Sequence, residues 1–221
     1  MKRKREIEKG SEIRSAIEEL TMLVKLKPSD NPDASYILPT MPFLSICNLV
    51  LQVLDKIGPT MTVMRKDVHQ NIERLEKVVE SDPLLYSNLV EVLKKEASEN
   101  KARIRNSSSR AFVWLTRSLD FSVALLQNLT KDFGQNMEQA VEESYNITLK
   151  PWHGWISSAA FKVALKIVPD TKSFISLLIA KHESQETLKE EMQTLISLLL
   201  TFLEDVHSIL ALYHLDGIKS T

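Results

Sequence analysis

Cysteine is almost absent from this sequence of 221 residues, which contains a single example, Cys47. An internal disulfide is therefore excluded, and the chain needs no oxidising compartment. Glycine is also scarce, and five residues are few for a protein built on hairpins or on phosphate-cradling loops. No stretch approaches the roughly 18–20 uncharged apolar residues of a membrane-spanning helix, and the charged N-terminus lacks the apolar part of a secretory signal. Together these absences predict a soluble protein of the cytoplasm.

An excess of charge of one sign is missing as well. The chain has 28 basic and 29 acidic residues, so its formal net charge of −1 gives no general attraction to nucleic acid or to an anionic membrane. The local exception is the basic run at residues 2–5, which could serve nuclear import but is more simply a solvated tail. The remaining composition is that of a globular protein, with 43% hydrophobic and 26% charged residues. We therefore expect a flexible basic tail over residues 1–10 and a single domain over residues 11–221.

What the sequence does contain is helical periodicity. Apolar residues recur at steps of three and four along most of the chain, and no internal repeat, βαβ alternation or period of two is found. Proline and glycine mark the ends of the segments, as at Gly58-Pro59, Pro151 and Pro169. The pattern predicts an all-α fold of about eight helices. The expected helices cover residues 13–24, 43–57, 62–79, 83–100, 110–129, 137–149, 154–168 and 186–213, with a further short segment near 174–179.

Three of these segments are apolar on more than one face, namely residues 112–129, 154–168 and 195–213. A helix that is apolar all round is either a central helix of a layered stack or part of the lining of a cavity. Periodicity alone leaves both interpretations open.

A row of polar residues lies along one face of the expected helix at 62–79. Asp67, Asn71 and Arg74 are spaced at i, i+4 and i+7, which places them on the same side of a helix. Such a row is usually a solvated face. An acceptor, an amide and a fixed cation in sequence would also suit a ligand that carries several hydroxyl groups.

Tryptophan is concentrated around one histidine. The run at residues 151–155 reads Pro-Trp-His-Gly-Trp, in which His153 is either a structural residue or a ligand-binding group, and Gly154 suggests a tight backbone. The third tryptophan, Trp114, falls in an apolar helix and is a core residue by default.

Taken together, three runs of residues resemble the glycolipid transfer protein family. They are RKDVHQNIERLEK (65–77), FVWLTRSLDF (112–121) and PWHGWI (151–156). The family's pattern is Asp-x-x-x-Asn-x-x-Lys/Arg on one helix, Trp-Leu-x-Arg on another and a later His-Gly-Trp. Order and intervals agree from about residue 43 to residue 213, and the wording at 144–155 is similar to that of plant members. The resemblance implies a two-layer all-α sandwich that opens to admit a sphingolipid.

The resemblance also implies a role for each motif. Trp114 would be the platform on which the first sugar stacks, and His153 would donate to the carbonyl of the ceramide amide. Asp67, Asn71 and Arg74 would hydrogen-bond sugar hydroxyls, with Asp67 also accepting from the amide N–H.

The remaining implied positions are apolar. Phe121, Phe161 and Leu165 would line the acyl pocket, and Trp155 would touch the membrane surface.

The function implied is that of a monomeric carrier that binds a glycosylceramide-type lipid and moves it between membranes without converting it. No Gly-x-Ser-x-Gly, His-Glu-x-x-His or P-loop motif is found, so no enzymatic activity, cofactor, metal ion or nucleic-acid partner is expected. A sphingolipid sensor or adaptor that presents the lipid to a protein partner would use the same site, and the sequence does not separate the two.

Arg110 departs from the sugar-binding pattern. It lies one turn before Trp114, and in ceramide-phosphate carriers of the family arginines occupy both positions. A guanidinium could grip a phosphate there, so a ceramide-phosphate carrier is the alternative. Because Trp114 and Asn71 are both of the sugar type, we expect a sugar headgroup and an Arg110 side chain turned to solvent.

Overall fold

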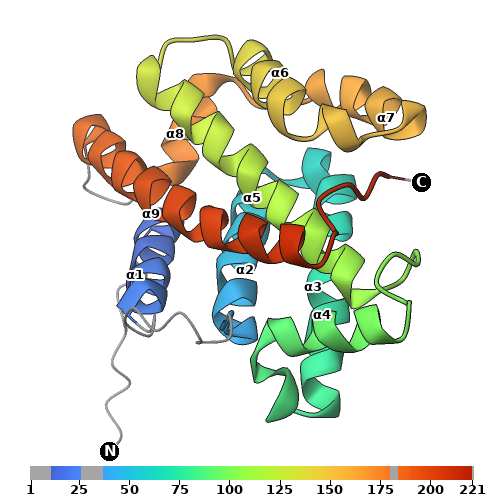
Figure 1. Ribbon diagram of the computed structural model, residues 1–221. Helices are drawn as coiled ribbons and strands as arrows, with labels where there is room; N and C mark the ends of the chain where they lie inside the picture. The colour runs from blue at the N-terminus through green and yellow to red at the C-terminus, as the bar shows by residue number, and fades with distance from the viewer. Residues whose placement is uncertain (1–10, 26–36, 180–183, 221) are drawn as a thin grey trace, which may run out of the picture.

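The computed structural model describes residues 11–25, 37–179 and 184–220. Within these ranges the chain forms nine α-helices and three short 3₁₀ helices, and no strand. The all-α prediction is confirmed. The expected basic tail at residues 1–10 lies outside the described residues. The α-helices, labelled in Figure 1, are α1 (Glu12–Lys25), α2 (Thr40–Ile57), α3 (Thr62–Ser81), α4 (Leu89–Ser98), α5 (Ser108–Lys131), α6 (Met137–Thr148), α7 (Trp155–Leu165), α8 (Thr171–Leu178) and α9 (Gln185–Leu212), and the 3₁₀ helices are η1 (Pro59–Met61), η2 (Leu85–Ser87) and η3 (Lys150–Trp152).

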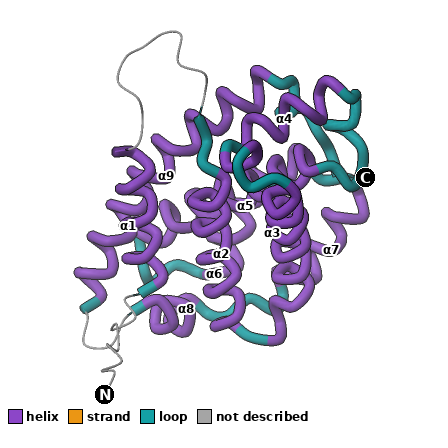
Figure 2. The backbone as a smooth tube through the Cα atoms, turned by 90° about the horizontal axis from the view of Figure 1, so that it is seen from below, coloured by secondary structure: helices purple, strands orange, loops and turns teal. Residues whose placement is uncertain are grey.

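Five helices close a ring around the core in two layers. In one layer α2 lies between α1 and α3, as Figure 1 and Figure 2 show from two directions. The other layer is formed by α5 and α9, which pack on each other. The edges are closed where α3 meets α5 and where α1 meets α9. Helix α6 packs on α5, α7 on α6 and α8 on α2, so these three cover one end of the sandwich. The two-layer arrangement implied by the resemblance is therefore confirmed.

Three phenylalanines join the two layers. Phe43 of α2 meets Phe112 of α5 edge to face, with ring centroids 5.1 Å apart, and lies 6.3 Å from Phe202 of α9. Cys47, one turn after Phe43, is buried in the same core, and burial raises the pKa of its thiol well above the ordinary range.

By length and composition, α2 and α9 are apolar enough to cross a bilayer, which corrects the expectation that no segment could. In their most apolar windows, 39% of the α2 residues and 44% of the α9 residues are buried within the protein. Both helices contribute residues to the core between the layers and to the wall of the cavity described below. The expectation failed because a core helix that also faces a cavity is apolar over more than one stripe.

The start of α4 also differs from the expectation. Asp82-Pro83 was expected to begin the helix, but residues 83–88 form a turn and η2, and α4 begins at Leu89. The reason is Asn88, whose side-chain oxygen accepts from the N–H groups of Val90 and of Leu38. This double role caps α4 and ties it to the segment before α2, which a local pattern does not reveal.

Candidate functional site

The polar residues of the candidate site are distributed over three parts of the chain: α3, α5 and the segment just before α7. α3 packs along α5, and the ring centroids of Trp114 and His153 lie 5.5 Å apart. Trp114 is half-buried on α5, and His153 is the extended residue between η3 and α7. The contributing residues are Asp67, Asn71 and Arg74 of α3, Trp114, and His153.

The three α3 residues are linked along their helix. Asn71 Nδ2 donates to the Asp67 carbonyl oxygen at 3.0 Å, and Arg74 Nη1 donates to Asn71 Oδ1 at 3.3 Å. Because Asn71 is buried, these two bonds hold its amide in one orientation. Among the described residues the Asp67 carboxylate accepts no hydrogen bond, so both of its oxygens are free to accept from a ligand.

The Asp67 carboxylate is open to solvent on one side, yet its pKa is raised. The surrounding protein desolvates the charged form, and the positive charge of Arg74 offsets this only in part. A poorly solvated carboxylate gains more from an added N–H or O–H donor than a fully hydrated one does. Asp67 is therefore well suited to accept a hydrogen bond from a ligand.

The Trp114 indole rests on a buried cation. Arg117, one turn further along α5, is 4% exposed, and its guanidinium carbon lies 4.9 Å from the Trp114 ring centroid and 4.2 Å from that of Trp152. Burial lowers the pKa of Arg117 to about 10. The cation between two indoles fixes the position of Trp114. Sequence reasoning gave Arg117 no role, although its i, i+3 spacing from Trp114 was visible.

His153 connects the polar site to the apolar interior. Its Nδ1 lies 3.2 Å from the hydroxyl of Tyr145, whose ring stacks on Phe161 at a centroid distance of 3.5 Å. Burial and the charge of Arg117 lower the pKa of His153, so the ring is neutral at pH 7. Gly154 has an ordinary φ of −77°, so the tight backbone expected there is absent.

Arg110 does not turn to solvent, and that expectation is wrong. Its side chain is 9% exposed, and Nη2 donates to the Lys219 carbonyl oxygen at 2.6 Å. Burial and the nearby charges of Arg105 and Arg74 lower the pKa of Arg110. The guanidinium is thus a buried cation at the border between α3 and α5.

The segment after α9, residues 213–220, was given no role by the sequence and contributes to this site. We call it the terminal strap. Leu215 and Ile218 anchor it in the core. Arg117 donates to the backbone carbonyl oxygens of Asp216 at 2.9 Å and of Ile218 at 2.6 Å. Arg110 donates to the backbone carbonyl oxygen of Lys219, as described above. Because backbone carbonyls carry no sequence signal, periodicity could not identify this partner.

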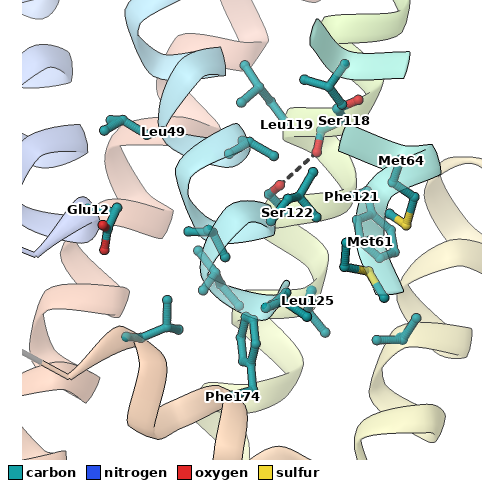
Figure 3. Close-up of a pocket in the computed structure, with 18 of the residues that line it drawn as sticks. Glu12, Leu49, Met61, Met64, Ser118, Leu119, Phe121, Ser122, Leu125 and Phe174 are labelled. Atoms are coloured by element: carbon teal, nitrogen blue, oxygen red, sulfur yellow. Dashed lines mark hydrogen bonds between the residues drawn. The ribbon is translucent and has the colours of Figure 1, made fainter. Parts of the chain in front are cut away.

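An apolar cavity of about 230 Å³ extends between the two layers (Figure 3). Its walls come from α1, α2, α3, α5, α6, α7, α8 and α9, and they include Phe121, Phe161 and Leu165. Two hydroxyls in the wall are turned back onto α5, since Ser118 donates to the Trp114 carbonyl and Ser122 to that of Ser118. The surface offered to an occupant is therefore almost entirely hydrocarbon.

The outer face of α7 is apolar and unburied. Trp155 is 82% exposed, and Ile156 and Val163 are exposed beside it. In this helix Leu165 is the one buried residue. An apolar face at the entrance of a polar site is typical of a surface that meets another phase or partner.

Comparisons with known proteins point to one family. The family model described as glycolipid transfer protein matches residues 38–180. Glycolipid transfer protein 3 of Arabidopsis thaliana is 56% identical over 232 aligned residues and covers 100% of both chains. The structure of FAPP2, a protein that selects simple glycosphingolipids, superimposes with a TM-score of 0.77 at 23% identity, over 86% of this chain and 92% of that one. Human ceramide-1-phosphate transfer protein, bound to ceramide-1-phosphate, gives 0.79 at 16% identity, over 95% and 100%.

Proposed function

Because the chain belongs to the glycolipid transfer protein family, we propose that it carries a glycosylceramide-type sphingolipid between membranes without converting it chemically. We further propose that it works as a monomer in the cytoplasm. The observation that carries the proposal is the direct junction of a hydrogen-bonding site with an apolar cavity. Tyr145 makes this junction, since it touches His153 on one side and Phe161 on the other.

In this proposal the polar site binds the headgroup and the amide. The C–H face of the first sugar stacks on Trp114, and its hydroxyls bond to the α3 row. Asp67 accepts from the amide N–H, while neutral His153 donates one N–H to the amide carbonyl. The Tyr145 hydroxyl has one proton and lies 3.2 Å from both His153 Nδ1 and Ser158 Oγ. When it donates to Nδ1, the His153 donor is Nε2. A ceramide amide thus finds one acceptor and one donor, and neither of its polar groups is left unpaired.

The cavity supports the proposal through the energy of the hydrocarbon chains. At ~0.8 kcal/mol per buried methylene, exposing a chain of about 16 carbons to water costs on the order of 10 kcal/mol. A wall of hydrocarbon replaces much of that loss, so transfer between membranes quickens without a covalent step.

A ceramide-phosphate headgroup is the second candidate, and Arg110 favours it. The side chain lies near Arg74, and a phosphate would relieve the repulsion between their charges. Against it stands the indole at 114, which occupies the space where a phosphate held by arginine would sit. We therefore rank the sugar first.

A competition assay tests the function and the headgroup together. Vesicles containing labelled glucosylceramide and ceramide phosphate are mixed with acceptor vesicles, and we expect glucosylceramide to transfer at least several-fold faster. Equal rates, with Arg110→Ala removing only the ceramide-phosphate activity, would show that the site selects phosphate. Transfer of neither lipid would contradict the carrier, and release of free ceramide would indicate an enzyme.

Membrane docking is expected to depend on Trp155. Replacing it by alanine should weaken vesicle binding roughly 5- to 10-fold, because an indole at the interface combines apolar burial with a hydrogen-bond donor. Co-sedimentation with vesicles measures this. Leu84, which is 91% exposed on the turn before α4, gives the control, since Leu84→Ala should bind normally. Binding by the wild type that collapses in moderate salt would instead indicate an electrostatic mode.

A further inference from the structure

His153 lies in the connection between two helical segments of the headgroup site. It is extended, with φ −82° and ψ 134°, between the end of η3 and the start of α7. The residue at the N-cap of α7 is Gly154, so the helix receives no side-chain cap of its own. The His153 N–H donates to the carbonyl oxygens of Leu149 and Lys150, so the local bonds hold the side of His153 that faces η3.

Ser220 of the terminal strap adds support from a distant part of the chain. Its N–H donates to the Trp152 carbonyl oxygen at 2.8 Å, and its Oγ accepts from the Gly154 N–H at 2.7 Å. Its Oγ also lies 3.2 Å from the hydroxyl of Ser157, which donates to it. One residue thus holds the peptide groups on both sides of His153.

Ser220 packs closely against Gly154. A Cβ built at that position would lie 3.6 Å from Ser220 Oγ and 3.8 Å from the Ser220 carbonyl oxygen. Both distances are ordinary van der Waals contacts, so alanine would be accommodated here without moving the strap.

The strap is itself firmly held, so it can act as a support. It leaves α9 through His214, which has a positive φ of 54°, and Leu215 N–H closes the turn onto the Leu210 carbonyl at 2.8 Å. From there the carbonyl bonds from Arg110 and Arg117 attach it to α5. The same arginine that supports Trp114 thereby also fixes the strap that supports His153.

We propose that Ser220 is a positioning residue that holds His153 against Trp114 for recognition of the lipid amide. This inference rests on the proposed function, since it assigns Ser220 to the same site. The hydroxyl is the group responsible, because the backbone N–H alone would hold only the Trp152 side of the histidine.

Two substitutions at Ser220 test this inference. Ser220→Ala removes the hydroxyl and keeps the N–H, and it should lower the rate of glucosylceramide transfer about 3- to 10-fold, as expected for loss of one hydrogen bond. Ser220→Thr keeps the hydroxyl and should restore most of the rate. Ser208→Ala is the matched control, since Ser208 is exposed on α9 and its hydroxyl donates to the Glu204 carbonyl of the same helix.

An NMR titration of His153 in the lipid-free protein distinguishes positioning of His153 by Ser220 from a general effect of the substitution on the fold. In Ser220→Ala the ring should become more exposed, so the pKa of His153 should rise towards its ordinary value, and the Gly154 amide should exchange faster with solvent. A slower transfer with both signals unchanged would overturn the positioning role. Because this measurement needs no ligand, failure of the carrier function and failure of the positioning role can be told apart.

Discussion

Replacing Trp114 by alanine is expected to slow glycosylceramide transfer by roughly two orders of magnitude. An indole face that covers about 100 Å² of apolar ligand surface is worth about 2.5 kcal/mol at ~25 cal/mol per Å², and each ~1.4 kcal/mol is a factor of ten. The substitution also uncovers one side of the Arg117 guanidinium, which lies 4.9 Å from the ring centroid. Transfer of a fluorescent glycosylceramide between vesicles measures the effect.

The fold of this variant must be checked separately, because Trp114 is half-buried. Losing one cation–π contact should cost about 0.5–2 kcal/mol, which lowers Tm but leaves the helices formed. Trp114→Phe is the matched control, since it keeps an aromatic face and should retain an intermediate rate. A folded Trp114→Ala protein that transfers glycosylceramide normally would show that the headgroup binds elsewhere.

Asp67→Val is expected to slow transfer about 10- to 100-fold. The substitution leaves the amide N–H of a buried ceramide unpaired, at a cost of ~1–3 kcal/mol. Arg74→Ala should do less harm, because a partly wet sugar hydroxyl can turn to water, and a rate within about 5-fold of wild type is expected for that variant. The opposite order of damage would indicate that charge dominates and that the site selects phosphate.

Asp67→Val is expected to keep or gain thermal stability although it loses transfer activity. The pKa of Asp67 is raised by burial, so its folded state favours the protonated form, and ionisation at neutral pH costs stability. Valine removes that cost, so Tm at pH 7 should be equal to or above that of the wild type. The difference should shrink as the pH falls through the range in which Asp67 becomes protonated. Loss of activity with no loss of stability is the behaviour of a binding residue and not of a core residue.

Much of the helical framework could be predicted because one stripe of apolar residues is enough to place a helix. The break at Gly58-Pro59 and the span of α3 agree closely with the expectation for this reason. The start of α4 could not be predicted, because the Asn88 side chain accepts a hydrogen bond from the Leu38 N–H, fifty residues away in the sequence. A local sequence pattern reveals hydrogen bonds between neighbouring residues, whereas the start of α4 depends on a hydrogen bond to a distant residue.

The same distinction separates the parts of the site. Asp67, Asn71 and Arg74 share a helix face, so their spacing shows that they lie together. The place of Arg110 could not be read from its sequence neighbours, because its partner is a backbone carbonyl in the terminal strap. Any residue type could supply that carbonyl, so the pattern of side chains contains no trace of it.

The terminal strap also determines when the site can exist during synthesis. Arg110 and Lys219 are 109 positions apart in the chain, and Gly154 and Ser220 are 66 apart. A ribosome that adds ~5–20 residues per second exposes α5 several seconds before the strap follows. During that interval the two arginines have no strap carbonyls to donate to, and His153 lacks the bonds from Ser220 on either side of it. The nascent protein thus forms its helices first and becomes competent to bind a headgroup last, after long-range closure of the strap.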